Sequence, residues 1–381
     1  MKIVINAFSA RLGGGQTYLK NLLAHLPEQP DFEILIYAPA SLGLPEDRRI
    51  RRATTIWPTQ NPLLRTLWEK IALPRILVKE RADVLFCPGG VVASRAPSGC
   101  KTVTMFRNMI PFDADAFARV PHGLQKIRNI LLKRVMLQSM ANADLTIFIS
   151  DYARSVIEAL TRVRNPITIP HGIGDAFRTH GQTLRRPAWL PTGEYLLYVS
   201  RFDVYKHQLE VASAFAALPS HLTSRYKLLL VGETDEMLSG QVADLAREKG
   251  LVHQIRIIGP IAYADLPAAY HHATVNLFAS SCENCPNILL EALSAGRPVL
   301  SSDVMPMPEF GGDAVAYFSP FDPDDIARAI EKVLTDNEYA QRLATAAAQR
   351  STRFDWEGTA RATWGHIFGL IDRRELVMDA V

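Results

Sequence analysis

The sequence lacks the features that mark a membrane-spanning, secreted or disulfide-stabilised protein. No apolar run approaches the roughly 18–20 residues that cross a bilayer. Four cysteines among 381 residues are too few for a disulfide framework. The first residues, MKIVINAFSA, are β-rich and contain one lysine, so we expect a first strand there and not a signal peptide. These absences favour a cytoplasmic protein.

The chain also lacks a strong net charge, but its two halves differ in sign. Residues 1–185 contain 25 Lys and Arg against 14 Asp and Glu, whereas residues 186–381 contain 17 against 25. A positive N-terminal half attracts anionic partners. Because the sequence contains no nucleic-acid-binding motif, we expect no nucleic acid as partner. A membrane surface or a phosphorylated acceptor fits better.

Short aliphatic segments alternate with longer helical ones in both halves. The expected strands of the first half are KIVINAF, FEILIYA, ADVLFCP, KTVTMF, DLTIFIS and PITIPHG. Those of the second half are YLLYVS, KLLLVG, IRIIG, VNLFAS, RPVLSS and VAYFS. This alternation predicts two α/β domains with mostly parallel sheets, each covered by helices on both faces.

One aperiodic segment, GQTLRRPAWLPTG, separates the two halves. We therefore expect an N-terminal domain over residues 1–182, a linker over 183–192 and a C-terminal domain over 193–359. A last helix, over about 360–381, is expected to pack back on the first domain. In doubly wound sheets a ligand lies at the carboxyl ends of the strands.

Candidate ligand-binding residues follow several of these strands. Gly14 and Gly15 lie in a Gly-Gly-Gly turn before a helix, where backbone N–H groups can approach a ligand. A tight turn without a ligand is the alternative. Arg201 and Lys206 follow YLLYVS, and two cations on one loop can hold a diphosphate; two solvated side chains are the alternative.

The most informative segment is SCENCPNILLEALSAG, which follows VNLFAS. Glu283 lies before Pro286, on the loop at the end of the strand, and Pro286 is expected at the first helical position. Glu291 stands among apolar residues of the helix, where a buried carboxylate needs hydrogen-bond donors such as ligand hydroxyls. The alternative is one exposed and one structural glutamate.

Three weaker patterns have simpler explanations. Cys282 and Cys285 form a single CxxC, without the second pair that a zinc site needs. Two Asp-x-Asp matches, at Asp113 and Asp322, could hold a metal–diphosphate, but Asp322 is better explained as a helix cap. Two basic, apolar helical stretches either contact anionic lipid or pack on the sheet. Their basic residues are Arg65, Lys70, Arg75, Lys79, Lys126, Arg128, Lys133 and Arg134.

Taken in order, these segments resemble the GT-B retaining glycosyltransferases called family 4. The resemblance covers nearly the whole chain, from the glycine turn through ITIPHGIGDAF, LYVSRFDVYKHQLEVASAF and KLLLVGE to RFDW. Glu283 and Glu291 match the family's E-x7-E signature. The resemblance implies two Rossmann-like, doubly wound domains that face a central cleft. It implies a hexosyltransferase that uses no metal or other cofactor.

The resemblance also implies roles for individual residues. Arg201 and Lys206 would hold the donor diphosphate and stabilise it as a leaving group. Glu291 would bind the ribose hydroxyls and Glu283 the donor sugar. The remaining donor-binding residues would be Gly14, Gly15, Gly232, Asn284, Cys285, Pro286 and Asn287.

One position departs from the family pattern. The family often has a His-Asp pair after the fourth strand of the first domain, whereas Arg107 and Asn108 follow KTVTMF here. We therefore expect Arg107 or Asn108 to contact the donor sugar or the acceptor.

We expect the donor to be a GDP- or UDP-sugar and the acceptor a glycan or a lipid diphosphate. Such a transfer would belong to surface polysaccharide or lipopolysaccharide synthesis, in the cytoplasm or at the inner face of the membrane. A nucleotide-sugar epimerase and a catalytically silent nucleotide-sugar-binding protein are the alternatives.

Overall fold

The computed structural model describes residues 1–11, 13–28, 31–120, 123–178 and 184–378. The chain divides into two compact units. Unit 1 comprises Met1–Gly172 together with Trp356–Val381, and unit 2 comprises Ile173–Asp355. The predicted α/β class with two Rossmann-like, doubly wound parallel sheets is confirmed.

The boundary lies about ten residues before the linker that we expected. Ile173 donates a backbone hydrogen bond to the Phe354 carbonyl at 3.1 Å, and the Arg178 guanidinium donates to the same carbonyl at 2.7 Å. These bonds hold the segment after Gly172 to the end of unit 2. Of the expected linker, residue 183 lies outside the described residues, and residues 184–192 belong to unit 2.

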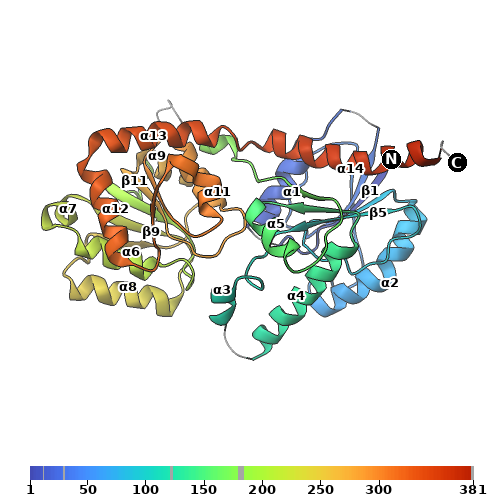
Figure 1. The fold of residues 1–381 in the computed structure, drawn as a ribbon, viewed down its shortest axis with the longest axis horizontal. Helices are drawn as coiled ribbons and strands as arrows, with labels where there is room; N and C mark the ends of the chain where they lie inside the picture. The colour runs from blue at the N-terminus through green and yellow to red at the C-terminus, as the bar shows by residue number, and fades with distance from the viewer. Residues whose placement is uncertain (12, 29–30, 121–122, 179–183, 379–381) are drawn as a thin grey trace. The chain divides into compact units, whose positions relative to one another are not determined.

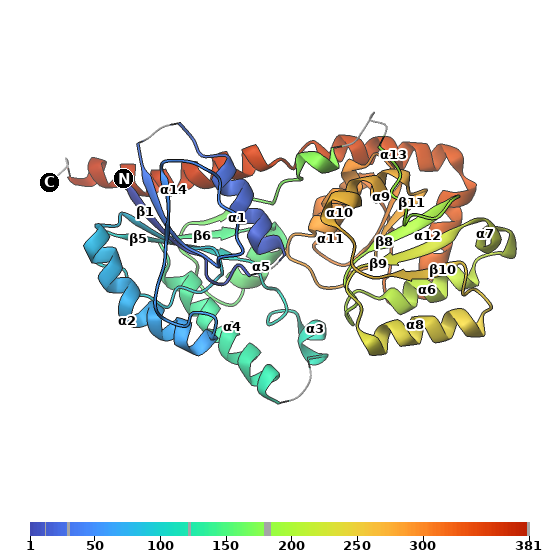
Figure 2. The same cartoon turned by 180° about the vertical axis from the view of Figure 1, so that it is seen from behind.

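Unit 1 contains a seven-stranded parallel sheet in the order β3-β2-β1-β4-β5-β6-β7. The strands are β1 (Lys2–Asn6), β2 (Glu33–Tyr37), β3 (Ile50–Ala53), β4 (Val84–Cys87), β5 (Lys101–Phe106), β6 (Leu145–Phe148) and β7 (Pro166–Thr168). The helices are α1 (Gly14–Ala24), α2 (Pro62–Glu80), α3 (Ala114–Ala118), α4 (Leu124–Asn142), α5 (Asp151–Glu158) and α14 (Trp356–Met378). Figures 1 and 2 both show α14 on the face of this sheet opposite α2 and α4.

Strand β3 was not predicted from the sequence. It pairs only with β2, at the edge of the sheet, and contains Arg51 and Arg52 in place of an apolar run. The Arg51 guanidinium donates to Glu80 at 3.0 Å, and that of Arg52 donates to the carbonyl of Pro39 at 2.8 Å. Basic side chains protect an exposed edge from further pairing, and they also hide the strand from a hydrophobicity pattern.

The final helix returns to unit 1 through aromatic side chains. The indole N–H of Trp364 donates to the Leu22 carbonyl of α1 at 3.1 Å. Phe32 packs against Trp364 and Phe368, with ring centroids 5.8 and 5.2 Å apart. Helix α14 therefore packs on α1 through aromatic side chains of the apolar core. It begins at Trp356, four residues before the expected start.

Unit 2 contains a six-stranded parallel sheet in the order β10-β9-β8-β11-β12-β13. The strands are β8 (Tyr195–Val199), β9 (Lys227–Val231), β10 (Ile255–Ile258), β11 (Val275–Phe278), β12 (Val299–Ser302) and β13 (Ala316–Phe318). All six match predicted segments. Every residue of β8 is buried, as expected for a central strand that helices cover on both faces.

The helices of unit 2 lie on both sides of this sheet, with α6 and α8 on one face and α9 and α13 on the other (Figures 1 and 2). The α-helices are α6 (Gln208–Ala217), α7 (Ser220–Arg225), α8 (Glu236–Glu248), α9 (Leu266–His272), α10 (Asn287–Ser294), α11 (Met307–Gly311), α12 (Pro323–Thr335) and α13 (Asn337–Ser351). Three 3-10 turns complete the unit: η1 (Asp175–Phe177), η2 (Tyr263–Asp265) and η3 (Gly312–Ala314).

Candidate functional site

The strand order of each sheet reverses at one point, between β1 and β4 in unit 1 and between β8 and β11 in unit 2. Loops that leave the carboxyl ends of two such strands diverge, and the crevice between them is where doubly wound folds bind ligands. The predicted residues of unit 2 lie on the loops after β8 and β11, directly after β9 and on α10. Those of unit 1 lie at the start of α1, which follows β1, and on the loop after β5.

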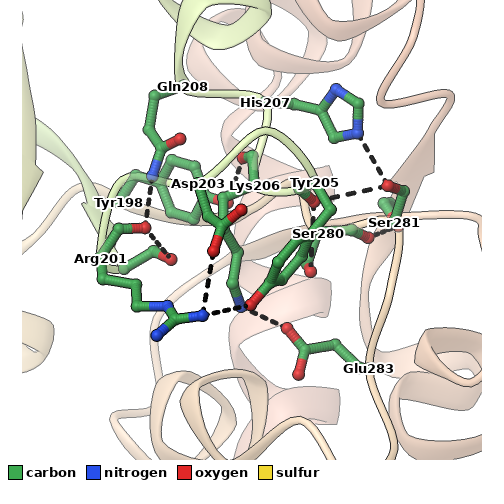
Figure 3. A network of polar contacts seen from close by, with 12 residues as sticks. Tyr198, Arg201, Asp203, Tyr205, Lys206, His207, Gln208, Ser280, Ser281 and Glu283 are labelled. Atoms are coloured by element: carbon green, nitrogen blue, oxygen red, sulfur yellow. Dashed lines mark hydrogen bonds and ion pairs between the residues drawn. The ribbon is translucent and has the colours of Figure 1, made fainter. Parts of the chain in front are cut away.

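Two loops of unit 2, residues 200–207 after β8 and 279–286 after β11, are held together by hydrogen bonds. The Ser281 backbone N–H donates to the Tyr205 carbonyl at 2.9 Å. The His207 imidazole Nε2 lies 2.9 Å from the Ser281 hydroxyl (Figure 3). Contacts within the chain thus fix the arrangement of the two loops.

Lys206 and Glu283 meet between these loops. The Lys206 ammonium forms a hydrogen-bonded ion pair with the Glu283 carboxylate (Figure 3). Lys206 is buried, and its ammonium lies 5.3 Å from the ring centroids of both Tyr205 and Phe278. The ion pair and the aromatic rings replace the water that the cation loses, so the positive charge is kept in a mostly dry position.

Arg201 lies on the same loop and is more exposed. Its guanidinium donates to the Asp203 carboxylate at 2.9 Å and to the Tyr205 hydroxyl at 3.0 Å. Its side chain remains 55% accessible, so part of the guanidinium fork is open to solvent. Burial raises the pKa of Tyr205 to about 12, which keeps this phenol protonated and able to donate. The two cations at the carboxyl end of β8 therefore differ in exposure: Lys206 is buried, and the Arg201 guanidinium is partly open to solvent.

Gly232, directly after β9, lets this loop approach closely. Its φ is +146°, and a Cβ there would lie 2.3 Å from the Ser200 carbonyl oxygen and 3.0 Å from the Arg201 nitrogen. Any side chain would collide with backbone that cannot move without shifting β8. Gly232 thus positions Arg201 through the backbone.

Glu291 is the second glutamate of the signature and lies on α10. Its carboxylate accepts hydrogen bonds from the Tyr263 hydroxyl at 3.2 Å and the Tyr270 hydroxyl at 3.5 Å. Burial raises the pKa of Glu291 to about 7, although the two tyrosine donors pull it in the opposite direction. The sequence predicted a carboxylate in need of donors, and the structure supplies two tyrosines that the sequence pattern did not reveal.

Unit 1 has a hollow of about 220 Å³ at the carboxyl ends of β1, β4 and β5. Three predicted residues, Gly15, Arg107 and Asn108, line it together; Gly14 lies beside them at the start of α1. The other lining residues are Ser9, Ala10, Pro88 and Gly89. Small residues and backbone make up most of this surface, and Arg107 supplies its positive charge.

Arg107 takes the position at which the family pattern has a histidine. Its guanidinium carbon lies 5.9 Å from the Tyr18 ring centroid. A Cβ on Gly15 would lie 3.0 Å from Arg107 Nη1, so the glycine makes room for the guanidinium. Asn108 Oδ1 accepts from the Ile110 backbone N–H at 3.3 Å, which fixes the turn after β5.

Two family models match the chain in succession. Residues 12–176 match the model described as Glycosyltransferase Family 4, and residues 183–350 match the one described as Glycosyl transferases group 1. The models therefore cover the unit 2 sheet and every strand of the unit 1 sheet except β1. The chain belongs to the GT-B glycosyltransferases of family 4.

Relatives of this glycosyltransferase include two mannosyltransferases of Escherichia coli. The serotype-specific mannosyltransferase WbdA is 28% identical over 270 residues; the match covers 68% of this chain and 32% of WbdA. The chain thus spans about a third of the length of that relative. The O-antigen chain mannosyltransferase B is 25% identical over 272 residues, which are 69% of each chain.

A solved structure shows the same fold. The Anabaena protein HepE, determined in complex with UDP and glucose, superposes with a TM-score of 0.71. The superposition covers 97% of this chain and all of HepE, at 17% sequence identity. The shared feature is the GT-B architecture.

The start of α10 differs slightly from the position that the sequence pattern predicted. The helix begins at Asn287, so Pro286 occupies the N-cap position and not the first helical one. Asn284 and Cys285 are buried beside it. The segment presents the first backbone N–H groups of the helix, a feature that favours a bound anion or a sugar hydroxyl.

A buried polar contact behind the unit 1 hollow was not predicted. Asn6, at the end of β1, donates to the Glu69 carboxylate of α2 at 2.9 Å, and burial raises the pKa of Glu69. Arg65, one turn earlier, reaches the Phe8 carbonyl at 3.5 Å. These contacts anchor the loop after β1. A lone glutamate beside Trp68 was the only signal in the sequence.

The two Asp-x-Asp patterns are helix caps in this glycosyltransferase. Asp113 accepts from the Ala116 backbone N–H at 2.7 Å, and Asp322 accepts from that of Asp324 at 3.0 Å, as predicted for Asp322. Among the described residues no three His, Cys, Asp or Glu side chains gather as a metal site would require. The Cys282 and Cys285 thiols are buried.

Proposed function

We propose that this glycosyltransferase moves a hexosyl group from a GDP- or UDP-sugar to a glycan or lipid-diphosphate acceptor, retaining the anomeric configuration. The observation that carries the proposal is the buried Lys206 beside Arg201 at the carboxyl end of β8. The names of the relatives favour mannose as the first sugar to test and surface polysaccharide as the product. The UDP held by HepE supports a nucleotide diphosphate.

The leaving group sets the electrostatic requirement. When the bond between the anomeric carbon and the β-phosphate oxygen breaks, negative charge grows on the diphosphate. Lys206, which is buried, and Arg201, whose guanidinium is partly open to solvent, would stabilise that charge. We propose that these cations take the place of a metal ion.

Glu283 is proposed to interact with two groups in turn. In the structure its carboxylate pairs with the Lys206 ammonium. With the diphosphate in place, Lys206 gains a stronger anionic partner, and the Glu283 carboxylate becomes available to accept hydrogen bonds from sugar hydroxyls. The acceptor hydroxyl attacks the face that the diphosphate leaves, and its proton passes to the departing β-phosphate oxygen.

Glu291 is proposed to bind the ribose. The Tyr263 and Tyr270 hydroxyls already donate to its carboxylate, and the ribose hydroxyls offer the same chemistry. In unit 1, Arg107 and Asn108 line the hollow that we assign to the acceptor or to the donor sugar.

The test is turnover of UDP- and GDP-sugars by the full chain in the presence of EDTA, followed by ¹H NMR of the product. We expect release of a nucleoside diphosphate and a product with the anomeric configuration of the donor. Epimerised donor in the absence of acceptor would contradict transfer, as would the absence of turnover with any donor. Lys206→Ala should lose this turnover. Lys249→Ala, which removes an exposed lysine elsewhere in unit 2, is the control and should retain it.

A further inference from the structure

The outer faces of α2 and α4 carry an unusual share of the exposed apolar surface. Ten of the eighteen large apolar side chains that are exposed among the described residues lie on these two helices. Leu63 is 80% exposed and Leu124 is 87% exposed. Contiguous exposed apolar surface commonly marks an interaction site.

Helix α2 is apolar on two faces. Leu73 and Leu77 are fully buried against the core of unit 1. Leu63, Leu67 and Ile71 follow one another at intervals of four residues and remain exposed. One apolar face of this helix therefore packs on the core of unit 1, and a second apolar stripe remains exposed.

Helix α4 repeats the arrangement. Met136 and Met140 are buried, whereas Leu124, Ile127 and Leu131 form an exposed stripe with spacings of three and four residues. Such spacing places side chains on one face of a helix. The stripe therefore forms a continuous apolar edge along the first two turns of α4.

The same surface is basic. Lys70 on α2 and Arg128 and Arg134 on α4 are exposed among the apolar residues. Helix α4 contains no acidic residue, and Glu69 of α2 is turned inward to Asn6. No exposed carboxylate of α4 therefore offsets the positive charge.

The two helices lie side by side. Figures 1 and 2 both show α2 and α4 next to each other on one face of the unit 1 sheet. Arg65 of α2 is half-buried, which lowers its pKa, and Arg128 of α4 is close enough to lower it further. The two stripes therefore belong to one surface, here called the α2–α4 surface: Leu63, Leu67, Lys70, Ile71, Leu124, Ile127, Arg128, Leu131 and Arg134.

We propose that the α2–α4 surface docks on an anionic lipid bilayer. Leucine and isoleucine side chains would enter the headgroup region while the lysine and arginines contact lipid phosphates. A second copy of the chain fits less well, because a two-fold contact would place like charges against each other. The described residues include no helix long and apolar enough to cross a bilayer, so the contact is peripheral.

The test is flotation of the full chain with vesicles of phosphatidylcholine, with or without phosphatidylglycerol, at increasing salt. No nucleotide or acceptor is present, so the outcome is independent of the proposed reaction. We expect binding only to the anionic vesicles, weakened by salt. The triple variant Leu63→Ser, Leu67→Ser, Ile71→Ser should lose at least about ten-fold in affinity. Arg128→Gln with Arg134→Gln should lose about five-fold for each arginine.

Matched controls lie elsewhere on the surface. Met237→Ser with Val252→Ser removes exposed apolar side chains of unit 2, and Arg162→Gln with Arg164→Gln removes exposed charges of unit 1. Both controls should bind like the wild type. If these controls weaken binding as much as the α2–α4 variants do, or if the folded wild type binds no anionic vesicle at low salt, the proposal is overturned.

A second measurement tests the proposal with single substitutions, for the case that the multiple-substitution variants do not fold. The four native thiols are buried, so a polarity-sensitive dye can be attached selectively to Leu67→Cys and, as a control, to Val252→Cys. We expect a blue shift with anionic vesicles only at position 67. A blue shift without vesicles that grows with protein concentration would instead identify a contact between copies and contradict the proposal.

Discussion

The two candidate ligand-binding regions of this glycosyltransferase differ in the contacts within the chain that hold their polar groups. In unit 2, the buried Lys206 pairs with the partly buried Glu283, and two tyrosines donate to Glu291. In unit 1, Arg107 and Asn108 line a hollow made mostly of small residues. A preorganised region suits a constant ligand such as a nucleotide diphosphate, whereas an open one tolerates variation in the acceptor.

Glycines show the same contrast. A Cβ at Gly232 would meet the backbone of Ser200 at 2.3 Å, whereas one at Gly15 would meet the end of the Arg107 side chain at 3.0 Å. Backbone cannot yield, but a flexible guanidinium can. The difference predicts that unit 2 is sensitive to small geometric changes and unit 1 is tolerant.

The largest effect is expected for Lys206→Met. Removing a cation that stabilises the leaving group should lower kcat by about 100- to 1000-fold. Leaving the partly buried Glu283 without its ion-pair partner should also lower the free energy of unfolding. Adding Glu283→Gln should recover the stability without recovering the rate, as measured by steady-state kinetics and urea denaturation. Recovery of both would mean that the pair is only structural.

Glu291 should make stability depend on pH. Its pKa is raised from 4.5 to about 7 in the folded protein, so between these values the folded state holds a proton that the unfolded state has lost. The contribution of Glu291 to the free energy of unfolding should therefore be largest below pH 4.5 and fall by about 3 kcal/mol as pH rises through 7. Denaturation of the wild type and of Glu291→Gln across this range checks it, since the variant should lack this component of the slope. Parallel profiles would contradict the assignment.

Gly232→Ala should cost on the order of 1–3 kcal/mol because the new Cβ strains backbone at positive φ. Turnover should fall as well, since the Arg201 loop must shift. The control is Gly240→Ala, inside α8 with no atom within 4 Å of the new Cβ, which should stabilise by about 0.5–1 kcal/mol. Thermal denaturation of both variants gives the comparison; equal effects would remove the special role of Gly232.

Gly15→Ala should change the free energy of unfolding least, within about 0.5 kcal/mol, because Arg107 can move aside. The transfer rate should nevertheless fall several-fold as the guanidinium leaves its position in the hollow. Gly365→Ala on α14, whose Cβ would meet open space, is the control for both measurements. A large loss of stability at Gly15 would show that unit 1 is as rigid as unit 2.

The fold could be predicted well because buried parallel strands are continuous aliphatic runs. All six strands of unit 2 and six of the seven in unit 1 were expected. The missed strand, β3, contains arginines at a sheet edge, where pairing depends on a neighbour and not on burial. The unit boundary at Ile173 was missed because hydrogen bonds to Phe354, distant in the sequence, hold that segment.

For the candidate site, the sequence predicted strand ends and helix starts but not long-range partners. The sequence predicted that Glu291 needs hydrogen-bond donors. It did not identify Tyr263 and Tyr270, which lie in a turn and a helix some 20 to 30 residues away. It placed Lys206 and Glu283 on loops after β8 and β11, and their pairing depends on these strands being neighbours. Asn6 and Glu69, 63 residues apart, carried no shared pattern at all.

We propose above that Lys206, with Arg201, meets the charge of a nucleotide diphosphate in place of a metal ion. Calorimetric titration of GDP and UDP into the full chain, with EDTA or with Mg²⁺, tests it most directly. We predict that at least one of them binds equally well in both buffers, and that Lys206→Met weakens binding of the diphosphate but not of the corresponding nucleoside. Binding that requires Mg²⁺, or that is unchanged in Lys206→Met, would contradict the account.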